Sequence, residues 1–305
     1  DSQEIVFWAG GKIQRVSMDG TAREIPFRVT DTRDVIDPPR PEVAVAPDTF
    51  STQMPRYVEV APDGNSVVFQ SLGKLYVKSL PNGSPRRLTS SPDGVRELFP
   101  SWSKDGRQLV YVAWTDDGLG KLKVMDAAGS NARTLTTRPG HYSNPSFSPD
   151  GRTVAFQRGG GGYLLSDLWS DETGIYTIDA SGGEQSLVSR SGYGPQFADR
   201  NDRIYFAKRE QGGSSFASMD LSGGDVRIHS KADLVVEWKV APDGKHVAFR
   251  DNYAAYVTPL LPGPQAVGAG KTGSALPVVK ASEGGATYFS WSDDGQQLNW
   301  TLGPE

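Results

Sequence analysis

The hydrophobic pattern of this chain repeats as short alternating runs on either side of a tight polar turn. In Pro145–Phe156, Phe147 precedes a Ser-Pro-Asp-Gly turn, and Val154 and Phe156 alternate after it. Proline presets φ, aspartate can hydrogen-bond its own backbone, and glycine accepts a positive φ without steric cost. The stretch therefore predicts an inner strand, a turn at Asp150-Gly151 and a second strand.

The same pattern recurs at five further places along the chain. Four of these copies keep the Asp-Gly turn, and a degenerate one has Arg200-Asn201 instead. The turn recurs about every 40–50 residues, a period typical of a radial array of small sheets. The further copies span residues 58–69, 100–111, 195–206, 238–249 and 289–300.

A third and a fourth strand are predicted after each second strand, separated by turns such as Asp126-Ala-Ala-Gly129. No run has the spacing of an amphipathic helix. Four strands per repeat predict an all-β fold, namely a β-propeller of four-stranded antiparallel blades. The alternatives are a β-sandwich, against which the regular period argues, and an open solenoid, against which the absence of polar capping repeats argues.

The chain begins and ends within incomplete repeats. Residues 5–28 predict a second, third and fourth strand, and residues 288–302 predict only the first two. Seven blades are favoured, with each piece forming its own blade, and six are the alternative if the pieces merge. We therefore expect one propeller domain over residues 1–305, interrupted by a proline-rich insertion at 30–55, in a chain that is a fragment of a longer protein.

The composition narrows the classes of partner and chemistry. A net charge of −4 without a basic stripe argues against nucleic acid. No apolar run is long enough for a membrane helix, so membrane insertion is not expected, and no signal peptide is visible. With no cysteine, the chain can form neither disulfides nor a cysteine zinc site, and it has no thiol nucleophile.

The sequence holds no recognisable catalytic set. Its histidines, His141, His229 and His246, include no His-x-His pair of the kind that binds a catalytic metal. No Gly-x-Ser-x-Gly motif occurs. Gly268–Gly273 matches Gly-x-Gly-x-x-Gly but lacks the following helix of a dinucleotide site, and we interpret it as a flexible blade insertion. No catalytic residue, metal or cofactor is therefore expected in this chain.

Residues just before each inner strand should line one rim of the central channel. There, mixed charges and aromatic rings could bind a peptide terminus, a ligand or a neighbouring domain. The alternative is that they merely solvate the channel mouth and pair with one another. The rim candidates are Arg56, Tyr57, Glu97, Phe99, His141, Tyr142, Tyr193, Glu237 and Tyr288.

The Ser-Pro-Asp-Gly turns, with an aromatic residue before them, resemble the WD40-like PD40 repeat of TolB-like propellers. A narrower resemblance is to the propeller segment of large bacterial amidohydrolase-related proteins. It rests on Leu72-Gly-Lys-Leu75, Pro85–Thr89, Pro139–Tyr142, the glycine run 159–162 with Leu168-Trp169, and Leu302–Glu305.

The resemblance implies a non-catalytic propeller that scaffolds or gates a metal-dependent amidohydrolase domain of the same parent protein. The divalent metal would belong to that downstream domain, and the location would be periplasmic or secreted. One alternative is a free-standing periplasmic propeller that binds another protein. A second alternative is a hydrolase acting in the propeller channel.

Overall fold

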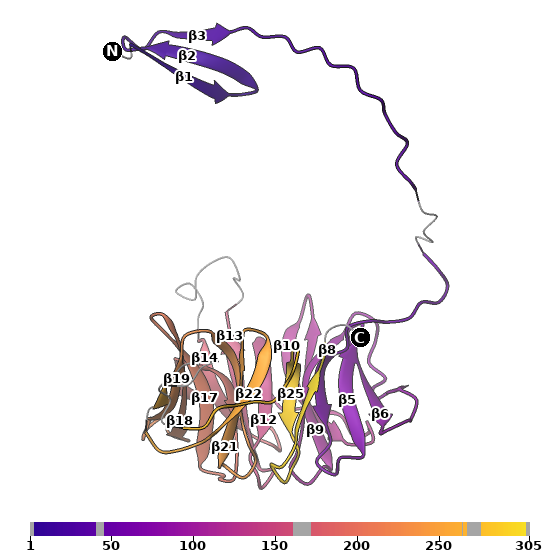
Figure 1. Ribbon diagram of the computed structural model, residues 1–305. Helices are drawn as coiled ribbons and strands as arrows, with labels where there is room; N and C mark the ends of the chain where they lie inside the picture. Colours follow the sequence, from indigo (N-terminus) through magenta and orange to yellow (C-terminus); the bar gives the residue numbers. More distant parts are fainter. Residues whose placement is uncertain (1–2, 41–45, 161–171, 264, 267–275, 303–305) are drawn as a thin grey trace. The chain divides into compact units, whose positions relative to one another are not determined.

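The computed structural model describes residues 3–40, 46–160, 172–263, 265–266 and 276–302 (Figure 1). Contacts between residues divide the chain into two units, Asp1–Phe50 and Ser51–Glu305. The regular elements of the described residues are β-strands, which confirms the all-β prediction. Within those residues no helix is long and apolar enough to cross a membrane. The insertion predicted at 159–171 and the motif Gly268–Gly273 lie largely or wholly outside the described residues.

The first unit contains a three-stranded antiparallel sheet in the order β1-β2-β3. Its strands are β1 (Glu4–Ala9), β2 (Lys12–Ser17) and β3 (Ala22–Ile25). Gly10 and Gly11 both take positive φ in the β1–β2 turn, as a two-residue hairpin loop requires. The three strands predicted from residues 5–28 are confirmed, and their membership of a blade stays a prediction.

The second unit contains six sheets within the described residues, of which four have four antiparallel strands. The first comprises β4 (Arg56–Val60), β5 (Ser66–Ser71), β6 (Lys74–Ser79) and β7 (Arg86–Arg87). The second comprises β8 (Arg96–Trp102), β9 (Gln108–Thr115), β10 (Leu119–Asp126) and β11 (Arg133–Thr134). The third comprises β12 (His141–Phe147), β13 (Thr153–Gly159), β14 (Gly174–Asp179) and β15 (Ser186–Ser189).

Of the other three sheets, the fourth has five strands, the fifth is the remaining four-stranded one and the sixth has two. The fourth comprises β16 (Tyr193–Gln196), β17 (Arg203–Glu210), β18 (Gly213–Asp220) and β19 (Arg227–Ala232), with the short β23 (Gln265–Ala266) added in parallel. The fifth comprises β20 (Val235–Val240), β21 (His246–Asp251), β22 (Ala254–Pro259) and β24 (Val279–Lys280). The sixth has only β25 (Thr287–Trp291) and β26 (Leu298–Thr301).

The first strands of these six sheets form a closed ring. β4, β8, β12, β16, β20 and β25 each contact the next, and β25 contacts β4. The second unit is therefore a β-propeller whose ring, within the described residues, is formed by six sheets. The predicted blade count, seven or six if the terminal pieces merge, stays a prediction. The seventh sheet of the described residues, β1–β3, belongs to the other unit.

The propeller has two faces, which differ in which chain segments form them. We call the start face the one at which the inner strands begin and the second strands turn into the third. The turn face is the opposite one, with the Asp-Gly turns between first and second strands; it is the lower edge in Figure 1. Antiparallel pairing fixes this division for every blade.

Each Asp-Gly turn is closed by hydrogen bonds within the turn. Ser148 Oγ donates to Asp150 Oδ1 at 2.6 Å, which also accepts from the backbone N–H of Arg152 at 3.1 Å. Gly151 has a φ of +70° and donates its N–H to the Ser148 carbonyl. These bonds hold the pKa of the Asp150 carboxyl below its usual value, the Ser148 hydroxyl contributing most. The repeated sequence therefore forms a rigid turn whose polar groups are hydrogen-bonded to one another.

The core lies between neighbouring blades and is built from a repeated aromatic pair. In the third blade Phe156 of β13 stands opposite Tyr176 of β14, with ring centroids 5.8 Å apart. The fifth blade repeats this with Phe249 and Tyr256 at 5.5 Å. Phe156 and Phe249 are fully buried, and each such ring stabilises the fold by about 1.5–3 kcal/mol. The alternation seen in the sequence thus buries the aromatic ring of the second strand in the second to fifth blades, whereas Trp300 of the sixth is 39% exposed.

Candidate functional site

All six inner strands carry a β-bulge near their start. The register shifts by one residue in β4, β8, β12, β16, β20 and β25. A bulge leaves one residue unpaired and re-aims its side chain, and bulges concentrate next to functional sites. The repeat therefore places a bulge in each blade at nearly the same level of the ring.

Residues at this level form a ring at the mouth of the channel. Five of them lie in the bulge of their strand and have positive φ, whereas the bulge of the fifth blade falls one residue earlier, on Val236, and Glu237 is paired with Arg250. In every blade the residue of this ring lies six positions before the turn aspartate or its counterpart Arg200. All six line one cavity of about 580 Å³ that also reaches the turn-face prolines Pro62, Pro149 and Pro242. This mouth ring comprises Tyr57, Phe99, Asn144, Gly194, Glu237 and Tyr288.

Three adjacent members of the mouth ring form an aromatic arc. The ring of Tyr57 lies 4.4 Å from that of Phe99 and 5.6 Å from that of Tyr288. All three residues have positive φ, between 50° and 53°. This conformation costs a bulky residue on the order of 1–3 kcal/mol and is concentrated at functional sites. Burial, with a smaller contribution from Tyr288, raises the pKa of the Tyr57 hydroxyl.

A second ring lies two residues further along each inner strand and is wholly polar. Its members also line the cavity, because alternate residues of a strand point the same way. Several bind the backbone of the next blade: Glu59 accepts from Trp102 N–H at 3.1 Å and Gln196 accepts from Val240 N–H at 3.0 Å. This deep ring comprises Glu59, Ser101, Ser146, Gln196, Lys239 and Ser290. It fastens neighbouring blades to one another.

Glu237 of the mouth ring forms an ion pair with Arg250, which stands opposite it on the neighbouring strand β21 of the same blade. Arg250 Nε lies 3.4 Å from Glu237 Oε2. Burial raises the pKa of Glu237, against the opposing effects of Lys239 and Arg250. Burial likewise raises the pKa of Glu59, against the opposing effect of Lys239 and a hydrogen bond from Trp102. For both carboxylates, burial therefore disfavours the charged form more than the nearby cations favour it.

The structure brings five of the rim candidates to the cavity and places four elsewhere. Tyr57, Phe99, Tyr193, Glu237 and Tyr288 line the cavity, and Arg209 lies 5.9 Å above the ring of Tyr193. The four that do not line it are Arg56, Glu97, His141 and Tyr142.

Glu97 and Tyr142 lie in the interior between blades. Glu97 is 0% exposed and accepts hydrogen bonds from Leu75 N–H at 2.9 Å and Thr89 Oγ1 at 2.6 Å. Tyr142 is buried and donates to the Arg138 carbonyl at 2.7 Å. Both stand before the bulge of their strand. The bulge adds one residue to the strand. Residues before it therefore point to the opposite face from the one that simple alternation along the strand would assign.

Sequence reasoning missed the deep ring, although the signal was present. Its members stand four positions before each turn aspartate, and strand alternation would have assigned them to the face of the mouth ring. It also missed Asn144 and Gly194, which complete the mouth ring at the positions where the third and fourth blades lack an aromatic residue.

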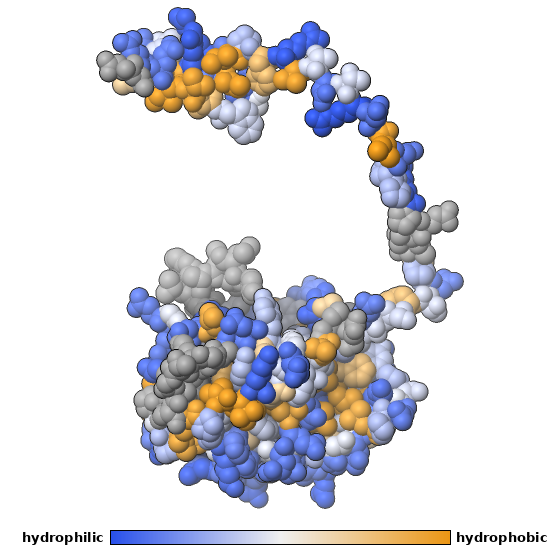
Figure 2. Space-filling view, viewed as in Figure 1, coloured by the Kyte–Doolittle hydropathy of each residue, from blue (hydrophilic) through white to orange (hydrophobic). Residues whose placement is uncertain are grey.

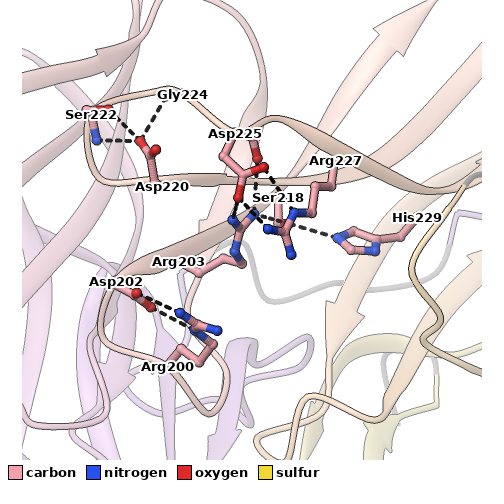
Figure 3. Close-up of polar contacts among 10 residues, drawn as sticks. All are labelled: Arg200, Asp202, Arg203, Ser218, Asp220, Ser222, Gly224, Asp225, Arg227 and His229. Carbon is pink, nitrogen blue, oxygen red and sulfur yellow. Dashed lines mark hydrogen bonds and ion pairs between the residues drawn. The ribbon is translucent and has the colours of Figure 1, made fainter.

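A separate polar cluster in the fourth blade has a structural role (Figure 3). Arg203 is buried, donates to Ser218 Oγ at 2.9 Å and pairs with Asp225, which also binds Arg227 at 2.6 Å. His229 Nε2 lies 2.8 Å from Ser218 Oγ, and its Nδ1 lies 3.2 Å from the Leu261 carbonyl. Since Ser218 is 0% exposed, this Ser–His pair is closed to substrate and holds β17, β18 and β19 together.

No group of three or more His, Asp or Glu side chains suited to hold a metal ion occurs within the described part of the chain. His141 instead packs beside Trp114 at 4.8 Å, and His246 lies 6.5 Å from Trp291.

Comparisons with known proteins agree with this architecture. The TolB β-propeller domain family, PD40, matches residues 59–261, which is more than half of the chain. The Tol-Pal system protein TolB of Francisella tularensis subsp. mediasiatica is 32% identical over 155 residues, which cover 49% of this chain and 34% of that protein.

Two solved structures share the fold alone. The putative TolB of Agrobacterium tumefaciens has a TM-score of 0.60 at 18% identity and covers 82% of this chain and 91% of its own. The oligogalacturonate lyase of Vibrio parahaemolyticus has a TM-score of 0.59 at 8% identity and covers 97% of this chain and 82% of its own. The match to the curated TolB relative spans about a third of that protein's length. The family match shows that this chain belongs to the TolB β-propeller domain family.

Proposed function

We propose that this propeller is a binding module whose start face docks a polypeptide. The leading partner is a metal-dependent amidohydrolase domain of the same parent protein, which the propeller would scaffold or gate. The alternative partner is a separate protein of the periplasm, in line with the similarity to a Tol-Pal system protein. In both cases the propeller contributes a binding surface and the partner contributes any chemistry.

The observation that carries the proposal is the distribution of strained large side chains over the described part of the propeller. Seven large apolar or aromatic residues have positive φ, and all belong to the start face. Non-glycine residues with positive φ at the turn face are instead Asn131 and Asp225, types that tolerate this conformation. The seven are Met54, Tyr57, Leu72, Phe99, Leu119, Tyr253 and Tyr288.

Several of these side chains are exposed although they are apolar. Leu72 is 68% and Tyr253 is 78% exposed, and Leu234 and Val236 of the same face are also exposed. Strain together with apolar exposure is unfavourable for an isolated domain. A surface of this kind is typical of a protein-binding site.

Site-specific photo-cross-linking in the host cell tests the proposal. A photoreactive phenylalanine analogue replaces Leu72 or Tyr253 on the start face, and Lys104 on the turn face serves as the control. We expect cross-links from the start face only, to peptides of a hydrolase domain of the same parent protein. Cross-links from these positions to a different protein would favour the periplasmic alternative. Equal cross-linking from Lys104, or none from the start face, would reject the docking surface.

A further inference from the structure

The mouth ring has two dissimilar halves. Tyr57, Phe99 and Tyr288 supply three aromatic rings from consecutive blades, with the sixth blade adjoining the first. The other half contains small or polar residues, Asn144, Gly194 and Glu237. An incoming side chain would therefore meet ring faces on one side and a carboxylate on the other.

Glu237, the carboxylate of this ring, has an ion partner but accepts no hydrogen bond within the described residues. Its partner Arg250 is 3.4 Å away, and the Arg250 Nε atom is buried without a hydrogen bond. Lys239, in the deep ring, acts on both Glu237 and Glu59 across the cavity. In the described residues the Lys239 ammonium has no ion pair within 4.0 Å. Glu237 therefore keeps acceptor oxygens that a donor entering the cavity mouth could reach.

Aromatic faces opposite a carboxylate are the surroundings that bind an ammonium or guanidinium group. The negative face of each ring attracts a cation, by roughly 0.5–2 kcal/mol per contact depending on exposure. A guanidinium group can also stack on a ring while it donates to a carboxylate. An acidic side chain would gain Lys239 and Arg250 but would face Glu237, Glu59 and the negative ring faces.

We propose that the mouth ring binds a basic side chain, arginine or lysine, of the polypeptide that docks on the start face. The aromatic arc stacks against the cation and Glu237 accepts its hydrogen bonds. This inference rests on the proposed docking function and names the chemical class that the channel mouth selects.

The test uses three probe peptides on the intact protein: acetyl-Gly-Arg-Gly-amide and its norleucine and glutamate counterparts. Binding is followed by tryptophan fluorescence, since Trp102 and Trp291 line the cavity. We expect the arginine peptide to bind about tenfold more tightly than the norleucine peptide. The glutamate peptide should bind most weakly.

Two substitutions of opposite charge sharpen this test. Glu237→Gln should remove most of the preference for arginine, whereas Lys239→Gln, which removes a competing cation, should strengthen arginine binding about threefold. Asp293→Asn removes the same charge as Glu237→Gln at the turn-face end of the cavity and is expected to leave binding unchanged. Thermal melting checks that each variant is folded.

The following outcomes would overturn the proposal: tightest binding of the glutamate peptide, equal binding of all three, or no binding of any. Weaker arginine binding in Lys239→Gln would also overturn the proposal. This variant decides the question if Glu237→Gln does not fold. Start-face cross-links from Leu72 do not depend on the channel charge. If they persist while the arginine preference is absent, docking stands and only the basic side chain is rejected.

Discussion

The two faces of the propeller are formed by the same repeat but differ in backbone strain and in hydrogen bonding. At the turn face, serine, aspartate and glycine satisfy one another within each turn, as in Ser148, Asp150 and Gly151. In the view of Figure 2 the lower edge of the ring is covered by hydrophilic residues. At the start face, Tyr57, Phe99 and Tyr253 stand in a conformation that glycine would adopt more readily. One face is thus built for stability, and the other keeps strain that the fold does not need.

The turn face also packs blade against blade. A Cβ added to Gly129 would lie 2.0 Å from the Leu88 carbonyl oxygen of the preceding blade, and one added to Gly223 would lie 2.1 Å from that of Val188. Each contact joins a turn between third and fourth strands to the fourth strand of the previous blade. The comparison therefore predicts that changes at the turn face cost stability, and that changes at the start face cost binding.

The largest effect is expected from Gly129→Ala. Its φ of +91° and the clash with the Leu88 carbonyl should lower the free energy of unfolding by about 3 kcal/mol. Gly151→Ala is the matched control, since it has a similar φ of +70° but no neighbour within 4 Å, and should cost about 1 kcal/mol. Urea denaturation measures both. Equal losses would contradict the blade-to-blade contact.

A pH effect is expected from His229, away from both faces. Burial lowers its pKa below 6.5, and Arg203 and Arg227 add to this. The unfolded chain then binds more protons, so stability is complete above about pH 6.5 and is lost as pH falls toward the lowered pKa. The slope is at most about 1.4 kcal/mol per pH unit. Denaturation of wild type and His229→Gln between pH 7.5 and 5 should differ in slope, and identical slopes would refute this.

A smaller loss is expected from Asp105→Ala at the turn face. Asp105 Oδ1 accepts from Ser103 Oγ at 2.7 Å and from Arg107 N–H at 3.0 Å, so the change should lower the free energy of unfolding by about 1 kcal/mol at pH 7. The Ser103 hydroxyl chiefly lowers the Asp105 pKa. The advantage of wild type should therefore be present above about pH 3.8 and shrink as pH falls through the lowered pKa. A pH-independent difference would count against the turn bonds.

The smallest effect has the opposite sign. Tyr253→Gly converts the turn Asn252-Tyr253, where both residues have positive φ, into an Asn-Gly hairpin turn. The free energy of unfolding should rise by up to about 1 kcal/mol, because the strain is released and little burial is lost. Binding of the docked partner should weaken. A destabilised variant, or one with undiminished binding, would break the contrast between the two faces.

The sequence by itself determined the repeat, the order of the strands and the Asp-Gly turns between first and second strands. Proline, aspartate and glycine at fixed spacing impose the turns locally, and the alternation of Val154 and Phe156 assigns their side chains to the core. It also supplied five cavity-lining residues, because the start of an inner strand is bound to lie near the channel. These features depend on interactions between residues close together in the sequence, so the sequence pattern is enough to predict them.

Only the tertiary structure decided which of these residues face the channel and how the ring closes. A single bulged residue reverses the face to which the preceding residues of the strand point. Glu97 and Tyr142 therefore lie in the interior, whereas Tyr57 and Phe99 line the cavity at its mouth. Closure through β25 and β4 joins segments far apart in sequence. The effect of Lys239 on Glu59 likewise joins strands of the fifth and the first blade, since electrostatic energy depends on distance and burial in space.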